Sequence, residues 1–304
     1  IQFKLKGTVS SDYDNYKTYY FAFHDVEEAG LTFDQNTVKV YVDGTEISSG
    51  YTVNTTDANK THNDCTFEVE FTDLKNIASV HAGSVITVEY KSILNSNAVL
   101  GEQGNVNKAK LEFSNNPNNE QVGRPDKPGE TPWDNVIVFT YKVLINKTDK
   151  DGNALSGAEF TLEKELQDGS KKKITVIKSE SGTTFEFKGL DDGNYILTET
   201  KTPDKYNTID PIKFTVTANH DITWEKQTRT VVLTKLSGNK VDGEITFTEK
   251  KDEGSLEANV VNMKGSQLPE TGGIGTTVFY VVGVILMLGA GVLLVTKKRM
   301  SSNR

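Results

Sequence analysis

Short segments in which apolar and polar residues alternate recur along most of this 304-residue chain. In Ile1–Lys6, for example, Ile1, Phe3 and Leu5 face one side while Lys4 and Lys6 face the other. A period of two residues is that of a β-strand with one buried face. The other segments of this kind are 19–26, 37–42, 66–71, 85–90, 109–115, 159–164, 173–177, 184–187, 195–200, 212–217, 230–233, 244–248 and 258–263. Short strands separated by turn-rich pieces predict an all-β chain built from antiparallel sandwiches.

The bulk composition limits both the core and the partners. An apolar content of 36% is low for one large core, but it suffices for thin sandwiches in which each sheet has one wet face. The net charge is −8, which argues against nucleic acid as the partner. Cys65 is the one cysteine, so no intrachain disulfide can form.

The sequence predicts no cofactor and no metal site. The four histidines show no ligand-like spacing, and no Ser–His–Asp set is recognisable. Residues 149–153 begin like a calcium loop. However, Ala154 and Phe160 stand at its sixth and twelfth positions, where an EF-hand requires Gly and Glu.

The C-terminal segment contains an uncharged apolar run, Thr276–Val295, followed by the basic residues 297–299. As a helix this run would rise about 30 Å, enough to cross the hydrocarbon core of a membrane. The basic residues would then lie on the cytoplasmic side. By itself the run predicts an ordinary C-terminal membrane anchor with one transmembrane helix at about 276–295.

The pentapeptide Leu268-Pro269-Glu270-Thr271-Gly272 precedes the apolar run. An LPxTG pentapeptide, an apolar span and a basic tail in this order resemble the cell-wall sorting signal of Gram-positive surface proteins. The resemblance implies that a sortase cleaves after the threonine and transfers its carbonyl group to a cell-wall amine. The helix would then hold the precursor in the membrane only transiently.

The division of the chain follows from its strand and loop segments. Residues 117–132 are rich in Pro, Asn and Gly and are predicted to form a loop, whereas residues 136–147 are almost continuously β-forming. We therefore expect one sandwich to pass into the next without a flexible linker. The predicted parts are 1–141, 142–264 and 265–304. Because the chain begins inside an alternating segment without Met or a signal peptide, we expect a fragment that lacks its N-terminal part.

Three strands place one polar side chain each on their apolar face. Lys147 follows Val143 and Ile145, Glu199 follows Tyr195 and Leu197, and Asn262 follows Ala258 and Val260 in the alternation. Buried Lys and Glu must be paired or neutral, because an isolated buried charge costs several kcal/mol. The alternative is that all three lie at strand ends and reach solvent.

Two segments near these residues resemble the Cna-B or SpaA-type pilin domain. They are 147–160 (KTDKDGNALSGAEF) and 195–206 (YILTETKTPDKY), and the resemblance covers about 136–264. It implies an Ig-like sandwich in which Lys147 forms an isopeptide bond with Asn262, assisted by Glu199. The family has Ala and Gly where this chain has Thr202 and Lys205.

The first sandwich carries a similar pattern, because Asp25 follows Phe21 and Phe23, and Asn115 follows Leu111 and Phe113. Residues 30–33 (GLTF) and 114–117 (SNNP) resemble the isopeptide-forming fimbrial domain of pilin backbone subunits. The resemblance implies that Asn115 is the acceptor and Asp25 the assisting acid. The donor lysine belongs on a strand before the first residue, so we expect that this bond cannot form here.

The spacing of Trp133 and Lys142 resembles the pilin motif WxxxVxVYPK, which presents a lysine for polymerisation. Thr140 and Tyr141 replace the Tyr and Pro of that motif. Lys142 is therefore either a polymerisation lysine or, as the favoured interpretation, an ordinary strand residue.

These resemblances imply a structural surface protein rather than an enzyme, in which two tandem Ig-like (Cna-type) sandwiches precede the transmembrane helix. The expected function is that of a backbone subunit of a sortase-assembled pilus, secreted and covalently attached to the cell wall. Its expected partners are sortase, peptidoglycan and other pilin subunits. The alternative is a wall-anchored adhesin that binds host extracellular matrix and uses these domains as its stalk.

Overall fold

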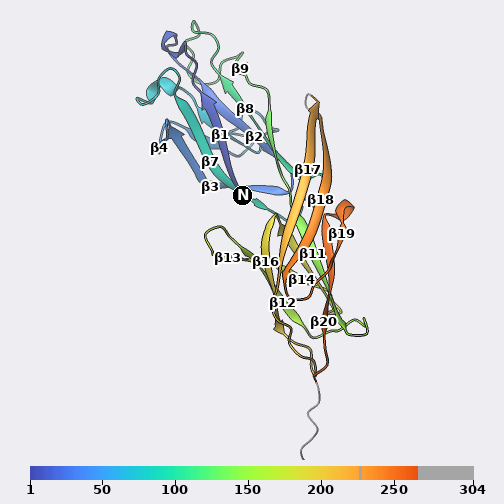
Figure 1. Cartoon of the computed structure of the whole chain (residues 1–304). Coiled ribbons are helices and arrows are strands. Elements are labelled where there is room, and N and C mark those ends of the chain that lie inside the picture. The colour runs from blue at the N-terminus through green and yellow to red at the C-terminus, as the bar shows by residue number, and fades with distance from the viewer. Residues whose placement is uncertain (226–227, 266–304) are drawn as a thin grey trace, which may run out of the picture.

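The computed structural model describes residues 1–225 and 228–265. This part of the chain consists of β-strands and the short 3₁₀ helices η1 (Tyr13–Asn15), η2 (Leu74–Asn76) and η3 (Lys251–Glu253), so the all-β prediction is confirmed (Figure 1). The LPxTG pentapeptide and the predicted transmembrane helix lie outside the described residues. Among residues 1–225 and 228–265, no helix has the length and apolar character needed to span a membrane.

The N-terminal half contains two facing sheets. One has the strand order β1-β7-β3-β4 and is built from β1 (Gln2–Thr8), β3 (Leu31–Val42), β4 (Thr45–Ile47) and β7 (Val85–Leu94). The other has the order β10-β8-β2-β6-β5 and is built from β2 (Phe21–Glu27), β5 (Thr52–Asn54), β6 (Phe67–Phe71), β8 (Asn105–Phe113) and β10 (Asp134–Val138), with β9 (Gly129–Glu130) paired to β8. Buried aromatic side chains of both sheets fill the space between them, among them Phe3, Phe21, Phe67, Phe71 and Tyr90.

The C-terminal half contains a second pair of sheets. One has the order β14-β15-β11-β20-β19 and is built from β11 (Tyr141–Asp149), β14 (Val176–Lys178), β15 (Thr184–Leu190), β19 (Phe247–Lys250) and β20 (Ser255–Asn262). The other has the order β13-β12-β16-β17-β18 and is built from β12 (Glu159–Glu165), β13 (Lys171–Ile174), β16 (Gly193–Lys201), β17 (Ile212–Glu225) and β18 (Thr228–Asp242). The first and last strands of this half, β11 and β20, are neighbours and run parallel. This pair is an exception to the predicted antiparallel pairing.

A short connection joins the two halves. Only Phe139 and Thr140 separate β10, in the first pair of sheets, from β11, in the second. The hairpin β17–β18 is also much longer than the predicted segments 212–217 and 230–233, and it extends toward the N-terminal half (Figure 1). There the Leu233 N–H donates to Glu102 at 3.1 Å, and Arg229 lies 3.6 Å from Glu28. The hairpin therefore contacts the N-terminal half directly, in addition to the covalent connection through Phe139 and Thr140.

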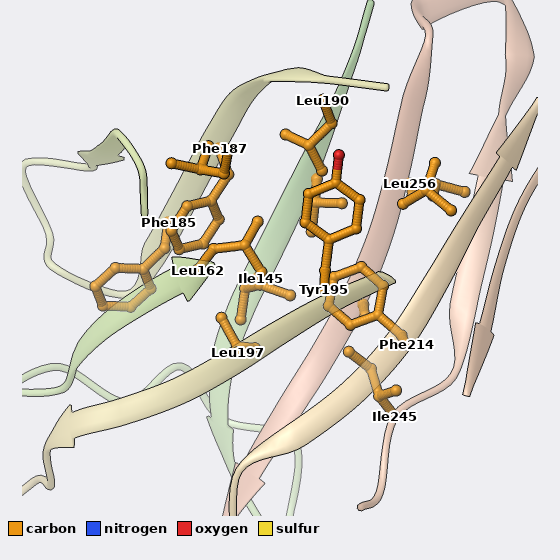
Figure 2. Close-up of a cluster of buried hydrophobic side chains, with 14 of the residues drawn as sticks. Ile145, Leu162, Phe185, Phe187, Leu190, Tyr195, Leu197, Phe214, Ile245 and Leu256 are labelled. Carbon is orange, nitrogen blue, oxygen red and sulfur yellow. The ribbon is translucent and has the colours of Figure 1, made fainter. Parts of the chain in front are cut away.

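The second core contains one continuous cluster of buried side chains (Figure 2). Replacing Phe187, which is fully buried on β15, by Ala is expected to lower the free energy of unfolding by about 3–5 kcal/mol, because a large cavity remains. Ile177→Ala on the adjacent strand β14 is the control, since Ile177 is 52% exposed. Calorimetric melting of the two variants tests this. Equal losses of stability would contradict the assignment of this core.

Candidate functional site

Lys147 is the polar side chain on the inner face of β11. The alternation that buries Val143 and Ile145 also places Lys147 inside, where it is fully buried. Its Nζ donates to the carbonyl oxygens of Val260, at 2.7 Å, and Thr148, at 3.1 Å. Burial lowers the pKa of Lys147 to about 8, although the negative charges of Glu199 and Asp149 act in the opposite direction.

These two hydrogen bonds match the donor capacity of a neutral amine. A neutral primary amine has two N–H groups and one lone pair, whereas an ammonium group has three N–H groups and no lone pair. With both N–H groups of Lys147 directed to backbone carbonyls, its lone pair remains free. The site can therefore hold a nucleophilic amine.

Asn262 is the last residue of β20 and is fully buried. Its Nδ2 donates to Glu199 Oε2 at 3.0 Å and to the carbonyl oxygen of Asn207. Because a backbone carbonyl can only accept a hydrogen bond, the Asn207 contact supports this orientation of the amide. The buried Oδ1 of Asn262 has no hydrogen-bond partner among the described residues.

Glu199 reaches the same place from β16, in the facing sheet, and is 5% exposed. Its Oε2 also accepts hydrogen bonds from Thr202 Oγ1 at 3.3 Å and from the Ile209 N–H at 3.2 Å. Its buried Oε1, like Asn262 Oδ1, has no partner in the described part of the chain. A protonated carboxyl group and a primary amide can form two hydrogen bonds, and the second would satisfy both unpartnered oxygens.

The strand register explains why these side chains converge. In the parallel pair β11–β20, Lys147 lies opposite Val260 and Asp149 lies opposite Asn262. Lys147 and Asn262 are therefore two residues out of register on the same face of adjacent strands. Glu199 covers them from the other sheet, so the structure brings the three predicted residues together and excludes the strand-end alternative.

One departure from the pilin family lies close to this site. Lys205 has φ of +70°, in the left-handed region that favours glycine. The family has Gly at this position, and Lys205 lies in the turn after Glu199. The contacts of Glu199 itself involve Thr202, Ile209 and Asn262.

In the first sandwich, Asp25 is a fully buried acid whose side chain lies beside Tyr90 and Asn107. Tyr90 Oη donates to Asp25 Oδ2 at 2.7 Å, and Asn107 Nδ2 donates to Tyr90 Oη. Burial raises the pKa of Asp25 to about 8. Asp25 Oδ1 and Asn107 Oδ1 have no partner among the described residues.

The structure does not bring Asn115 to Asp25. Asp25 lies opposite Ala109 in the β2–β8 pair, whereas Phe21 lies opposite Phe113 at the other end. Asn115 follows the end of β8 and is exposed. The prediction that Asn115 and Asp25 act together is therefore corrected. The buried amide near Asp25 is that of Asn107, which the same alternation through 109, 111 and 113 could have identified.

Lys142, the candidate polymerisation lysine, lies on β11 with its side chain 20% exposed. Its Nζ is 3.7 Å from Glu186 and 3.8 Å from Glu253. Two carboxylates thus hold Lys142 against the sheet. The predicted sortase recognition and cleavage residues of this chain, 268–272, lie outside the described residues.

Comparison with protein families matches two parts of the chain. Residues 141–230 match the SpaA family, described as a prealbumin-like fold domain, and residues 261–302 match the LPXTG cell wall anchor motif. The chain carries a SpaA-type domain and an LPXTG cell-wall anchor. The SpaA-type match contains Lys147 and Glu199, and Asn262 lies beyond it on the last strand of the same pair of sheets. The anchor motif marks a surface protein that is attached to the cell wall.

Proteins similar to this chain include the trypsin-resistant surface T6 protein of Streptococcus pyogenes serotype M6. That protein is 27% identical, over 70% of this chain and 48% of the relative, so the chain spans about half the length of this curated relative. The full-length major pilin SpaD of Corynebacterium diphtheriae has a TM-score of 0.55 and 21% identity, over 88% of this chain and 61% of that one. A C-terminal fragment of the major pilin GBS80 of Streptococcus agalactiae has a TM-score of 0.52 and 22% identity, over 71% and 84%. These structural likenesses establish a shared fold.

Proposed function

We propose that this chain is a backbone subunit of a sortase-assembled pilus, closed by an isopeptide bond between Lys147 and Asn262. The proposal rests on one observation: the Lys147 amine, the Asn262 carboxamide and the Glu199 carboxyl group are buried together. Lys147 and Asn262 lie on the adjacent first and last strands of the SpaA-type half, and Glu199 lies in the facing sheet. In this proposal, 1–141 is the fimbrial domain, 142–264 the cross-linked pilin domain and 265–304 the sorting signal.

The proposed reaction is a condensation that releases ammonia. The neutral Nζ of Lys147 attacks Cγ of Asn262, so a C–N bond forms and the Cγ–Nδ2 bond breaks. Protonated Glu199 donates a hydrogen bond to Oδ1 of Asn262 and stabilises the negative charge that develops there. Glu199 then relays the proton lost by the amine to Nδ2, from which it is 3.0 Å away, and ammonia leaves. Each chain reacts once, so the protein is not an enzyme in the usual sense.

The position of the proposed bond suits a load-bearing shaft. It joins neighbouring parallel strands at the beginning and end of the SpaA-type half. A covalent link there prevents force from peeling the last strand away from the first. On the loop-entropy model used for disulfides, it also stabilises the fold by roughly 4–5 kcal/mol.

The relatives favour a shaft over the alternative of an adhesin stalk. The solved structures of similar fold are described as major pilins, and the SpaA-type domain is combined with an LPXTG anchor. Sortase, peptidoglycan and further copies of the subunit are therefore the proposed partners.

Loss of the sorting pentapeptide is expected to remove the protein from the cell wall. In Leu268→Ala, the sortase motif is broken, so the chain should move from the detergent-resistant wall fraction to the detergent extract or the medium. Immunoblots of the fractions measure this, and Gln267→Ala, which leaves the pentapeptide intact, is the matched control. Equal wall linkage of both variants would refute the sorting proposal.

The same fractions distinguish a shaft from a stalk. Wild-type chains released by wall-digesting enzymes should form a ladder of covalent polymers in denaturing gels, because backbone subunits are linked to one another. A single band with strong binding to immobilised matrix proteins would instead support the adhesin.

A further inference from the structure

The outer face of the sheet β10-β8-β2-β6-β5 holds a buried polar cluster that the proposed cross-link does not use. His24, Glu68 and Glu112 lie on β2, β6 and β8 and are fully buried, although they face away from the core between the sheets. His24 lies opposite Glu68 in the β2–β6 pair, and Glu112 lies opposite the neighbouring Ala22 in the β2–β8 pair. The cluster is covered by the segments that carry His62 and Arg124.

The ligand atoms of three of these residues surround one point. Nε2 of His62 is 2.6 Å from Glu112 Oε1, and Nε2 of His24 is 3.5 Å from Glu112 Oε2. One ligand atom from each of the three residues lies within 4.8 Å of the others. Nitrogen and oxygen ligands around a tetrahedral zinc ion are separated by roughly 3.3 Å, given metal–ligand bonds of about 2.0–2.2 Å. Small side-chain movements would therefore bring these atoms to coordination distance.

His24 is the residue that points to a ligand. It is fully buried, yet neither of its ring nitrogens makes a well-aligned hydrogen bond among the described residues. Nδ1 lies 3.1 Å from Glu68 Oε1. Glu68 is itself fixed by the backbone N–H groups of Thr61 and His62, each at 2.8 Å. Glu68 behind Nδ1 favours a proton there, whereas Nε2 faces Glu112 at 3.5 Å. A cation between His24 and Glu112 would therefore take the place of a proton on Nε2.

We propose that His24, His62 and Glu112 form a binding site for one divalent zinc-type cation, with Glu68 orienting His24. Two imidazoles and one carboxylate suit Zn²⁺, whereas Ca²⁺ and Mg²⁺ prefer ligand sets made of oxygen atoms. The ion would tie the segment that carries His62 to strands β2 and β8.

Two basic side chains compete with the cation for Glu112. Lys110 Nζ lies 3.6 Å from Glu112 Oε1, and Arg124 makes the closer contacts. Its Nε is 2.7 Å from Glu112 Oε2, and its Nη2 is 3.2 Å from Glu112 Oε1 and 3.4 Å from His62 Nε2. The Arg124 side chain is 32% exposed, so it can turn into solvent when an ion takes its place beside Glu112. Removing this positive charge should therefore strengthen metal binding.

Cys65 defines a second arrangement that the test must separate. Cys65, Glu68 and His24 also lie within 4.8 Å of one another through their ligand atoms. Glu68 already accepts hydrogen bonds from Thr61 Oγ1 and two backbone N–H groups, which favours its role as a support for His24 over that of a ligand. We therefore assign the ion to the side of His24 that faces His62.

The experiment is a titration of the full chain with Zn²⁺ by isothermal calorimetry, after purification in a mild detergent and removal of metals with a chelator. Wild type should bind one ion per chain, and Zn²⁺ should raise its Tm. His62→Ala should weaken binding at least tenfold and lose the Tm shift. The matched control is His81→Ala, since His81 has a side chain that is 70% exposed beside Asp43 and should leave binding unchanged.

Further variants separate the two ligand sets. Arg124→Gln should bind Zn²⁺ more tightly than wild type, and Cys65→Ser should bind within about threefold of it. His62→Gln serves if His62→Ala fails to fold. Absence of Zn²⁺ binding by wild type, or equal binding by the His62 and His81 variants, would reduce the cluster to an ion-pair network. A tenfold loss in Cys65→Ser with none in His62→Ala would also overturn the proposed site.

Discussion

The chain with Glu199→Gln is expected to have its full calculated mass, whereas wild type is expected to be lighter by about 17 Da, the mass of one ammonia. Gln fills the same space and can still accept the hydrogen bond from the Ile209 N–H. It cannot relay a proton between the amine and the leaving nitrogen. Intact mass spectrometry of the denatured full chains measures the difference, and peptide mapping should find Lys147 joined to Asn262 in wild type alone.

Loss of the bond should also lower resistance to heat and protease. The Glu199→Gln chain folds around the same core but lacks the covalent link between β11 and β20, so it should melt at a lower temperature. Glu163→Gln is the matched control, because Glu163 lies on the same sheet with its side chain 37% exposed. It should keep the mass deficit. A wild-type chain at full mass would end the cross-linking proposal.

The convergence of Lys147, Glu199 and Asn262 was predictable because each follows two apolar residues at alternating positions on its strand. Val143 and Ile145 before the lysine, like Tyr195 and Leu197 before the glutamate, are buried as the alternation requires. A period of two residues fixes the face of every residue on such a strand. The pairing of β11 with β20, by contrast, was implied by the family resemblance and not by the alternation.

Alternation failed where both faces of a strand are covered. On β2, His24 and Asp25 are both fully buried although they face opposite sides. On β8, the successive residues Asn105, Val106 and Asn107 are all buried. The covering segments come from distant parts of the chain, so local periodicity carries no information about them. This is why the sequence did not predict the cluster around His24.

The spacing of the histidines was uninformative for the same physical reason. His24 lies on β2, and His62 lies in the connection between β5 and β6. Motifs with regular ligand spacing arise when one helix or loop supplies several ligands. Here the cluster is assembled by strand pairing and by covering segments, which only the three-dimensional structure reveals.

With Glu199 protonated over the whole pH range, as the proposed reaction requires, the rate of cross-linking is expected to fall about tenfold for each pH unit below about 8. The attacking group is the neutral amine of Lys147, whose pKa burial lowers to about 8. A lowered pKa of a base means that the neutral form predominates above pH 8, while at pH 6 roughly one amine in a hundred is neutral. At an ordinary lysine pKa of 10.5, the reaction would be far slower at every pH in this range.

The measurement starts from full chains that were recovered unfolded and not yet cross-linked. They are refolded at pH values between 6 and 8, quenched with denaturant at intervals and scored by gel mobility, since a cross-linked chain is more compact when denatured. Lys142→Ala is the control and should give the same profile, because Lys142 lies on β11 beside Glu186 and Glu253 and outside the buried site. A rate that is independent of pH, or that rises as the pH falls, would contradict attack by the neutral amine. Such a result would mean that the protonation of a group other than Lys147 sets the rate.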